Sequence, residues 1–132
     1  MIKKILTAFL LLPTLLCAQI NTERAMTIAR NALYFEDYVL SIQYFNQVIN
    51  AKPYLYEPYF FRGLAKINLD DFQGAEADCD AAIDRNPFVV GAYQIRGLAR
   101  IRQNNYNGAI EDYQKALHYD PENITCLLYT SR

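Results

Sequence analysis

The sequence reads YEPYFFRGLAKINLDDFQGAEADCDAAIDRNPFV over residues 56–89 and then repeats itself as VGAYQIRGLARIRQNNYNGAIEDYQKALHYDPEN over residues 90–123. The identical pairs are Tyr59 and Tyr93, Arg62 and Arg96, Gly63 and Gly97, Leu64 and Leu98, Ala65 and Ala99, Ile67 and Ile101, Gly74 and Gly108, Ala75 and Ala109, Asp78 and Asp112, Ala82 and Ala116, and Pro87 and Pro121. Residues 22–55 follow the same register more loosely, with Pro53 standing 34 residues before Pro87. A fixed period of this length is typical of stacked helical repeats.

Each repeat predicts two amphipathic helices joined by a tight turn. The expected helices cover residues 22–34 and 38–51, 56–68 and 72–85, and 90–102 and 106–119, with turns near 35–37, 69–71 and 103–105. Small residues let the paired helices approach closely, and they are Gly63, Ala75, Ala82, Gly97, Ala109 and Ala116. Pro87 and Pro121 end the second helix of their repeats, because proline lacks an N–H and disfavours helix in the preceding residue.

The pattern resembles the tetratricopeptide repeat family, in which aromatic and small residues alternate ahead of a closing proline. In the third repeat these residues are Tyr93, Gly97, Tyr106, Ala109, Tyr113, Ala116 and Pro121. The second repeat departs at Cys79, and the first departs more, with Ala25, Ala29, Ser41 and Val48 at family positions. The resemblance implies an all-α solenoid of three helix-turn-helix repeats over 22–55 (degenerate), 56–89 and 90–123.

The first eighteen residues predict an export signal. Lys3 and Lys4 precede a charge-free apolar run that is too short to cross a bilayer and ends near Ala18. We therefore expect a signal peptide over residues 1–18 and a location in the periplasm or cell envelope of a bacterium. A lipid anchor at Cys17 and a buried N-terminal helix remain open as alternatives.

The last nine residues do not fit the repeat as well. A next helix would begin after Pro121-Glu122-Asn123, yet only residues 124–132 follow, and part of that string resembles translated sequencing adapter. We expect these residues to be a truncated or artefactual tail of a longer repeat protein. A short genuine C-terminal helix is the alternative.

Composition and motifs favour binding over catalysis. The net charge of −1 provides no basic face for nucleic acid, and the 52% hydrophobic content is enough for a packed core. No nucleophile motif, phosphate loop or metal-ligand spacing is present, so we expect no enzymatic activity and no cofactor. Neighbouring acids such as Asp78 with Asp80, and Glu111 with Asp112, are interpreted as a solvated face, and the lone His118 as a surface residue. Cys79 and Cys126 are not expected to form a disulfide.

One charged pair recurs at the repeat period. Arg62 and Asp78 are 16 residues apart, and so are Arg96 and Asp112. We expect structural ion pairs either within each repeat or from Arg96 back to Asp78.

The resemblance also implies a concave face lined by the first helix of each repeat, which would bind a peptide or a partner protein. The predicted contact residues are Arg30, Tyr34, Phe60, Phe61, Leu64, Asn68, Gln94, Leu98 and Arg102. Phe60 and Phe61 could instead be covered by the adjacent helix. Some family members grip a C-terminal carboxylate, but Met26 stands where a basic residue would be needed, so we do not expect that activity. An adaptor domain of a longer enzyme or signalling protein, and a lipid-anchored assembly factor, remain alternative functions.

Overall fold

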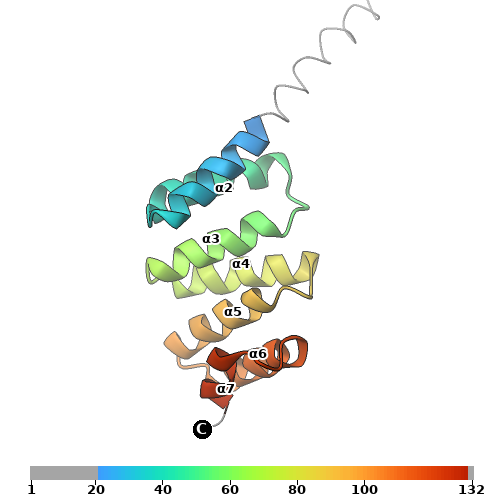
Figure 1. The fold of residues 1–132 in the computed structure, drawn as a ribbon. Coiled ribbons are helices and arrows are strands. Elements are labelled where there is room, and N and C mark those ends of the chain that lie inside the picture. The colour runs from blue at the N-terminus through green and yellow to red at the C-terminus, as the bar shows by residue number, and fades with distance from the viewer. Residues whose placement is uncertain (1–20, 131–132) are drawn as a thin grey trace, which may run out of the picture.

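The computed structural model describes residues 21–130, which fold into antiparallel helix pairs without any strand (Figure 1). The helices are a first helix over residues 21–34, α2 (Tyr38–Ala51), α3 (Glu57–Asn68), α4 (Phe72–Arg85), α5 (Val90–Arg102), α6 (Tyr106–Tyr119) and α7 (Ile124–Thr130). The helices predicted for the three repeats are confirmed to within one residue at each end. The predicted signal peptide over residues 1–18, with Cys17, lies outside the described residues.

The helices stack in chain order into a solenoid. Each helix from α2 to α7 packs on the next one along the chain, and α3 also contacts α5 directly. The first helices of successive repeats therefore form one layer, and the second helices form the other (Figure 1). None of the helices over residues 21–130 has the combined length and apolarity that a bilayer crossing requires.

All three turns within the repeats use the same backbone device. A residue with positive φ occurs once per turn, at Glu36 (63°), Asp70 (60°) and Asn104 (63°). The next residue caps the following helix: the side chains of Asp37, Asp71 and Asn105 accept hydrogen bonds from the backbone N–H groups of Leu40, Gly74 and Gly108. The left-handed residue reverses the chain, and the cap satisfies an N–H that the helix itself leaves unpaired.

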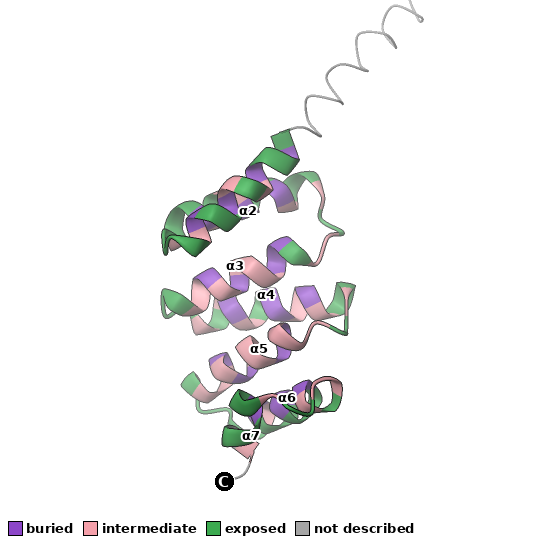
Figure 2. Cartoon of the chain, viewed as in Figure 1, coloured by how far each residue is buried: buried purple, intermediate pink, exposed green. Residues whose placement is uncertain are grey.

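Buried positions recur along the packed helices (Figure 2). The core depends on small residues facing larger ones. Tyr113 is 2% exposed and lies against Gly97, where an added Cβ would come within 3.0 Å of the tyrosine ring. At Gly63 the equivalent Cβ would keep 3.4 Å from its neighbours, because the smaller Cys79 replaces the tyrosine. The close approach predicted for both glycines is therefore tight only in the third repeat.

Tyrosine also ties each repeat to the proline that ends the previous one. The hydroxyl of Tyr59 donates to the carbonyl oxygen of Pro53 at 3.1 Å, and Tyr93 donates to Pro87 at 2.7 Å. A buried tyrosine needs such a partner for its hydroxyl. These two bonds fix the loop between repeats to the helix that follows it.

Residues 124–130 form helix α7. A short C-terminal helix was the alternative to a truncated tail for this segment. Cys126 is fully buried in one cluster with Tyr93 and Tyr113, against the side of α6 that faces α7. The side chain of Asn123 accepts from the backbone N–H of Cys126 at 3.2 Å, which caps the helix. A buried thiol and a capping side chain explain why this short segment is helical here.

Candidate functional site

The layer formed by the first helices of the repeats carries all nine predicted contact residues. In this layer Arg30, Tyr34, Asn68 and Arg102 are exposed, whereas Phe60, Phe61, Leu64, Gln94 and Leu98 are half-buried. The structure thus places the nine residues on three neighbouring helices. Their side chains differ in how much of their surface remains free for a ligand.

Phe61 is largely used for packing between repeats. Its ring stacks on the buried Phe45 of α2, with centroids 5.9 Å apart and planes inclined by 12°. The guanidinium of Arg30 lies 5.2 Å from the centre of the same ring. The adjacent helix α2 therefore covers Phe61, which is the alternative that the sequence left open for this residue.

Phe60 packs across the first turn of α5. A Cβ added at Gly91 would lie 2.8 Å from Cζ of Phe60, so the ring occupies the space that a side chain would need. The ring also lies against the cluster of Tyr59, Ala82 and Ala92. Phe60 therefore joins the second repeat to the third and is only partly available to a ligand.

An apolar pocket opens between α5, α6 and α7. It is lined by Gln94, Ile95, Leu98, Tyr113 and Thr125. Sequence reasoning included Gln94 and Leu98 but missed Ile95 and Thr125. Thr125 belongs to a segment that was expected to be a truncated tail. The amide of Gln94 donates to Asn123 Oδ1 at 2.9 Å, so this side chain is fixed at the rim of the pocket.

The remaining predicted residues lie near the turn ends of their helices. Asn68 donates from Nδ2 to the carbonyl of Leu64 at 2.8 Å. Arg102 lies 5.9 Å above the ring of Phe72, and Tyr34 meets Phe35 edge-to-face at 5.2 Å. None of these contacts buries the polar end of Arg102, which stays exposed.

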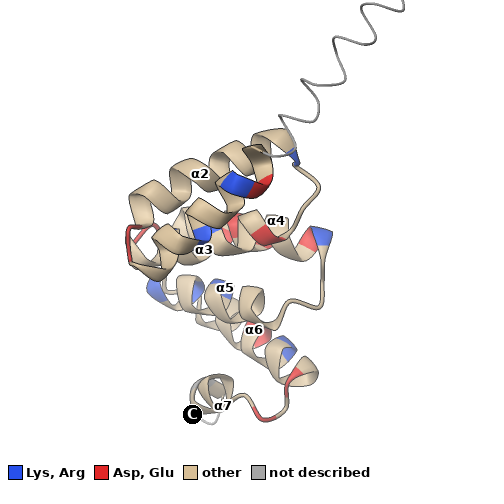
Figure 3. Cartoon of the chain, turned by 45° about the horizontal axis from the view of Figure 1, so that its top comes forward, with Lys and Arg blue, Asp and Glu red and all other residues tan. Residues whose placement is uncertain are grey.

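The recurring arginine–aspartate pairs form within the second and third repeats. This is the first of the two arrangements that the sequence predicted. Arg62 contacts Asp78 at 2.6 Å and Arg96 contacts Asp112 at 2.7 Å. Arg96 also reaches back to the preceding repeat, but its partner there is Asp80 at 2.8 Å and not Asp78. Figure 3 marks the basic and acidic positions along the described helices.

The interpretation of Asp78 and Asp112 as part of a solvated face is wrong. They are 4% and 2% exposed, because each turns toward the preceding helix and accepts from two cationic side chains. Lys66 adds a second contact to Asp78 at 2.9 Å, and Arg100 adds one to Asp112 at 3.0 Å. Burial alone would lower the pKa of Arg96, but its hydrogen bonds to Asp112 and Asp80 outweigh that effect and raise the pKa.

Comparison with known families agrees with this helix pattern and register. A family model described as tetratricopeptide repeat matches residues 90–123, and another with the same description matches residues 56–88. Together they cover just over half of the 132 residues. The chain belongs to the tetratricopeptide repeat family. No curated protein matches the sequence.

Solved tetratricopeptide repeat (TPR) domains share the fold over most of the chain. The Arabidopsis OM64 TPR domain has a TM-score of 0.82 at 27% identity, covering 84% of this chain and 92% of that one. The first TPR of Spaghetti (RPAP3), solved bound to the HSP90 peptide SRMEEVD, has a TM-score of 0.81 at 24% identity, covering 84% and 88%. The TPR2B domain of yeast Sti1, from its pHsp70 complex, has a TM-score of 0.77 at 24% identity, covering 85% and 94%.

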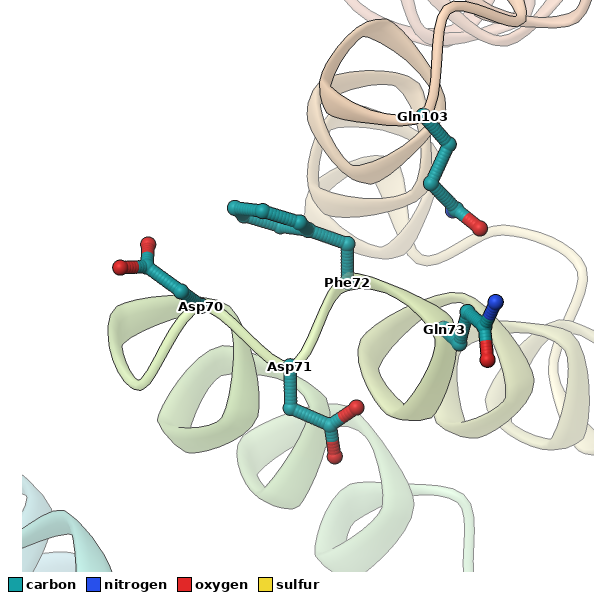
Figure 4. A pocket seen from close by; sticks show the side chains of 5 residues that line it. All are labelled: Asp70, Asp71, Phe72, Gln73 and Gln103. Carbon is teal, nitrogen blue, oxygen red and sulfur yellow. The ribbon is translucent and has the colours of Figure 1, made fainter.

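A second pocket of this TPR domain lies outside the predicted face, at the turn between α3 and α4. It is lined by Asp70, Asp71, Phe72, Gln73 and Gln103 and has a volume of about 340 Å³ (Figure 4). Its walls come from two repeats, because Gln103 caps the end of α5. Sequence reasoning interpreted Asp70 and Asp71 only as turn formers and did not find this pocket.

Potential reactive groups of the TPR domain lie away from both pockets. Burial, followed by the nearby charge of Asp78, raises the pKa of Cys79 to about 12, so this thiol stays protonated and unreactive. The exposed His118 packs edge-to-face on Tyr119 at 5.3 Å. Among residues 21–130 there is no group of three or more His, Cys, Asp or Glu side chains suited to hold a metal.

Proposed function

We propose that this TPR domain is a non-enzymatic scaffold that binds a peptide or a partner-protein segment on the inner layer of helices. The observation that carries the proposal is the matched pair Leu64 and Leu98. They occupy the same repeat position on α3 and α5, which contact each other, and both remain half-exposed. Asn68 and Arg102 follow one turn later on the same helices and add polar groups beside the apolar ones.

This combination suits an extended chain or a partner helix. Apolar side chains of the ligand would cover Leu64 and Leu98, and the exposed guanidinium of Arg102 would pair with a carboxylate or a carbonyl oxygen. The pocket beside Leu98 offers a place for one larger apolar side chain of the ligand. The packing of Phe60 and Phe61 between repeats supports the shape of this face more than it supplies contacts.

The ligand need not be the one bound by the related structures. At 24% identity, the likeness to the first TPR of Spaghetti bound to an HSP90 peptide supports a shared fold alone. Met26 also stands where a basic residue would be needed to grip a C-terminal carboxylate. We therefore propose an internal segment with apolar side chains as the ligand.

The test is peptide selection followed by affinity measurement. Peptides are selected from a random library on the wild-type chain, and their Kd is measured on Leu98→Ala/Arg102→Ala by fluorescence anisotropy. We expect binding at least about tenfold weaker, as the loss of one apolar and one charged contact implies. Equal affinity for wild type and variant would exclude the inner face as the binding site.

The matched control lies on the other layer of helices. Glu111 and Gln114 are exposed on α6, so Glu111→Ala/Gln114→Ala changes an equal number of surface residues away from the inner face. We expect this variant to keep the wild-type Kd. Thermal unfolding followed by circular dichroism checks that both variants remain folded.

We also propose that the domain acts outside the cytoplasm, in the periplasm or cell envelope of a bacterium. The basic start and short apolar run of residues 1–18 support this proposal. Expression in a bacterium followed by mass spectrometry of the mature chain tests it. We expect an N-terminus at Gln19, whereas a lipid-modified Cys17 would favour the anchored alternative.

A further inference from the structure

Exposed apolar side chains gather at the turn of the first repeat, next to Tyr34 of the predicted inner face. Phe35 is 78% exposed and Val39 is 58% exposed, and Tyr34 and Leu40 beside them are 81% and 37% exposed. The rings of Tyr34 and Phe35 meet edge-to-face. A group of exposed apolar side chains at one end of a folded domain is a typical sign of an interaction site.

The third repeat shows that the fold does not need apolar residues at these two positions, and the second shows it for one of them. The position of Phe35 is occupied by Leu69 and Gln103 in the second and third repeats, and that of Val39 by Gln73 and Asn107. All three turns have the same positive φ and the same cap. The apolar residues of the first turn are therefore not explained by folding.

Carboxylates lie at this turn and at the next turn in the stack. Glu36 and Asp37 belong to the first turn, and Asp70 and Asp71 belong to the next turn in the stack, where they line the pocket beside Phe72 (Figure 4). Figure 3 shows acidic segments in these turns. Within the part of the chain that the structure describes, none of these four carboxylates forms an ion pair, in contrast to Asp78 and Asp112.

We propose that this side of the domain binds a basic amphipathic segment of a partner protein. We call this surface the turn edge, and its residues are Tyr34, Phe35, Glu36, Asp37, Val39, Leu40, Asp70, Asp71 and Phe72. Apolar side chains of the partner cover Phe35 and Val39, and its lysines or arginines approach the four carboxylates. Opposite charges of this kind steer and orient a partner on a surface. The turn edge borders the inner face, since it shares Tyr34 with it and Arg102 lies 5.9 Å from the Phe72 ring. Its other residues lie on the turns, so this inference goes beyond the proposed function.

Charge distinguishes this occupant from the two other candidates. A second copy of the chain would bring two sets of carboxylates together, which opposes association. A lipid surface would have to desolvate Glu36 and Asp37, which lie between Phe35 and Val39 in the sequence. With a basic partner segment, by contrast, the same carboxylates attract the ligand and favour binding.

The test substitutes side chains that other repeats of this chain carry at the same positions, so the variant should fold. Phe35→Gln/Val39→Gln introduces the side chains found at Gln103 and Gln73, the equivalent positions of the other repeats. The probe is a synthetic amphipathic helix of leucine and lysine, compared with one in which glutamate replaces each lysine. We expect the wild-type chain to bind the lysine peptide at least about tenfold more tightly than the glutamate peptide, and the variant to lose at least about tenfold in affinity for the lysine peptide.

Two further variants separate the apolar and the charged contributions. Asp70→Asn should weaken lysine-peptide binding several-fold, and the difference from wild type should shrink at about 1 M salt, where charges are screened within about 3 Å. Tyr54→Gln is the control, since Tyr54 is 69% exposed in a loop between repeats and not in a turn within one. It should leave the affinity unchanged.

Several outcomes would overturn the proposal. Equal binding of both peptides, or an unchanged affinity in Phe35→Gln/Val39→Gln, would show that the turn edge does not select a basic apolar segment. Sedimentation analysis showing a dimer that this variant dissolves would assign the surface to a second copy. Binding to anionic vesicles that the variant abolishes, without peptide binding, would assign it to a membrane.

Discussion

Arg62 and Asp78 form a two-point ion pair within the second repeat. The Nε and Nη2 atoms of Arg62 donate to the two carboxylate oxygens of Asp78 at 2.8 and 2.6 Å, and its Nη1 donates to Asn46 of the preceding repeat at 2.8 Å. Arg96 makes the same pair of connections, to Asp112 in its own repeat and to Asp80 in the preceding one. Because the guanidinium is planar and rigid, each arginine fixes the position of two second helices relative to each other.

The first prediction concerns Asp112, a buried acid that contacts both Arg96 and Arg100. Asp112→Ala leaves Arg96 and Arg100 without the carboxylate that both contact, and should lower the free energy of unfolding by about 3 kcal/mol, as expected when one partner of a buried pair is removed. Urea unfolding followed by circular dichroism measures this loss.

Asp80→Ala provides the matched control for that measurement. Asp80 contacts the same Arg96, but its side chain is 49% exposed, so solvent screens the pair and the expected loss is below about 1 kcal/mol. Equal losses for Asp80→Ala and Asp112→Ala would show that burial of the carboxylate has no influence on its contribution.

The second prediction compares two glycines at the same repeat position. Gly97→Ala forces the Tyr113 ring to move, because the new Cβ would lie 3.0 Å from it, and should destabilise the fold by about 1–3 kcal/mol. Gly63→Ala meets its neighbours at an ordinary 3.4 Å and gains helix propensity, so it should be neutral or stabilising by up to about 1 kcal/mol. Thermal unfolding of the two variants provides the comparison, and a larger loss for Gly63→Ala would contradict the packing described here.

The repeat period predicted the helices, the turns and the arginine–aspartate pairs, since each depends on residues that recur at the same position. It could not predict that Asp78 and Asp112 are buried, because a carboxylate next to other acids in sequence normally faces solvent. Burial depends here on Lys66 and Arg100, which reach these acids from one turn further along the first helix.

The inner face was predicted at the level of helices but not of individual side chains. Phe60 and Phe61 both follow Tyr59 in sequence, and the family register alone does not show which neighbouring helix covers each ring. The covering groups are Gly91 and Phe45, one on each adjacent repeat. Ile95 and Thr125 were not assigned to a pocket, because one wall of that pocket is α7, in a segment that was expected to be a truncated tail.

The third prediction concerns the buried thiol of Cys79. Its pKa is raised to about 12 in the folded chain, mainly by burial, from an ordinary value of 9.0. Between these values the unfolded chain has lost the proton and the folded chain retains it, so the free energy of unfolding should fall as pH rises from about 9. Below pH 9 both states hold the proton, and this contribution to stability is fully present.

Comparison with Cys79→Ala isolates this effect, since titration of the tyrosines is common to both proteins. The wild type should lose stability more steeply above pH 9, by at most about 1.4 kcal/mol per pH unit. Identical pH slopes would contradict a raised pKa. Iodoacetamide labelling at pH 8.5 gives a second measurement, in which peptide mapping should find Cys79 labelled only as fast as the domain unfolds.

The last prediction concerns the left-handed residues of the turns. Glu36 and Asn104 adopt the same φ of 63°, but asparagine tolerates this conformation much better than glutamate does. Glu36→Gly should therefore raise the free energy of unfolding by up to about 1 kcal/mol, whereas Asn104→Gly should change it little, because glycine relieves less strain there and adds freedom to the unfolded chain. Urea unfolding of both variants distinguishes the two positions. A gain for Asn104→Gly as large as that for Glu36→Gly would mean that the side chain at the left-handed position does not determine the cost of the turn.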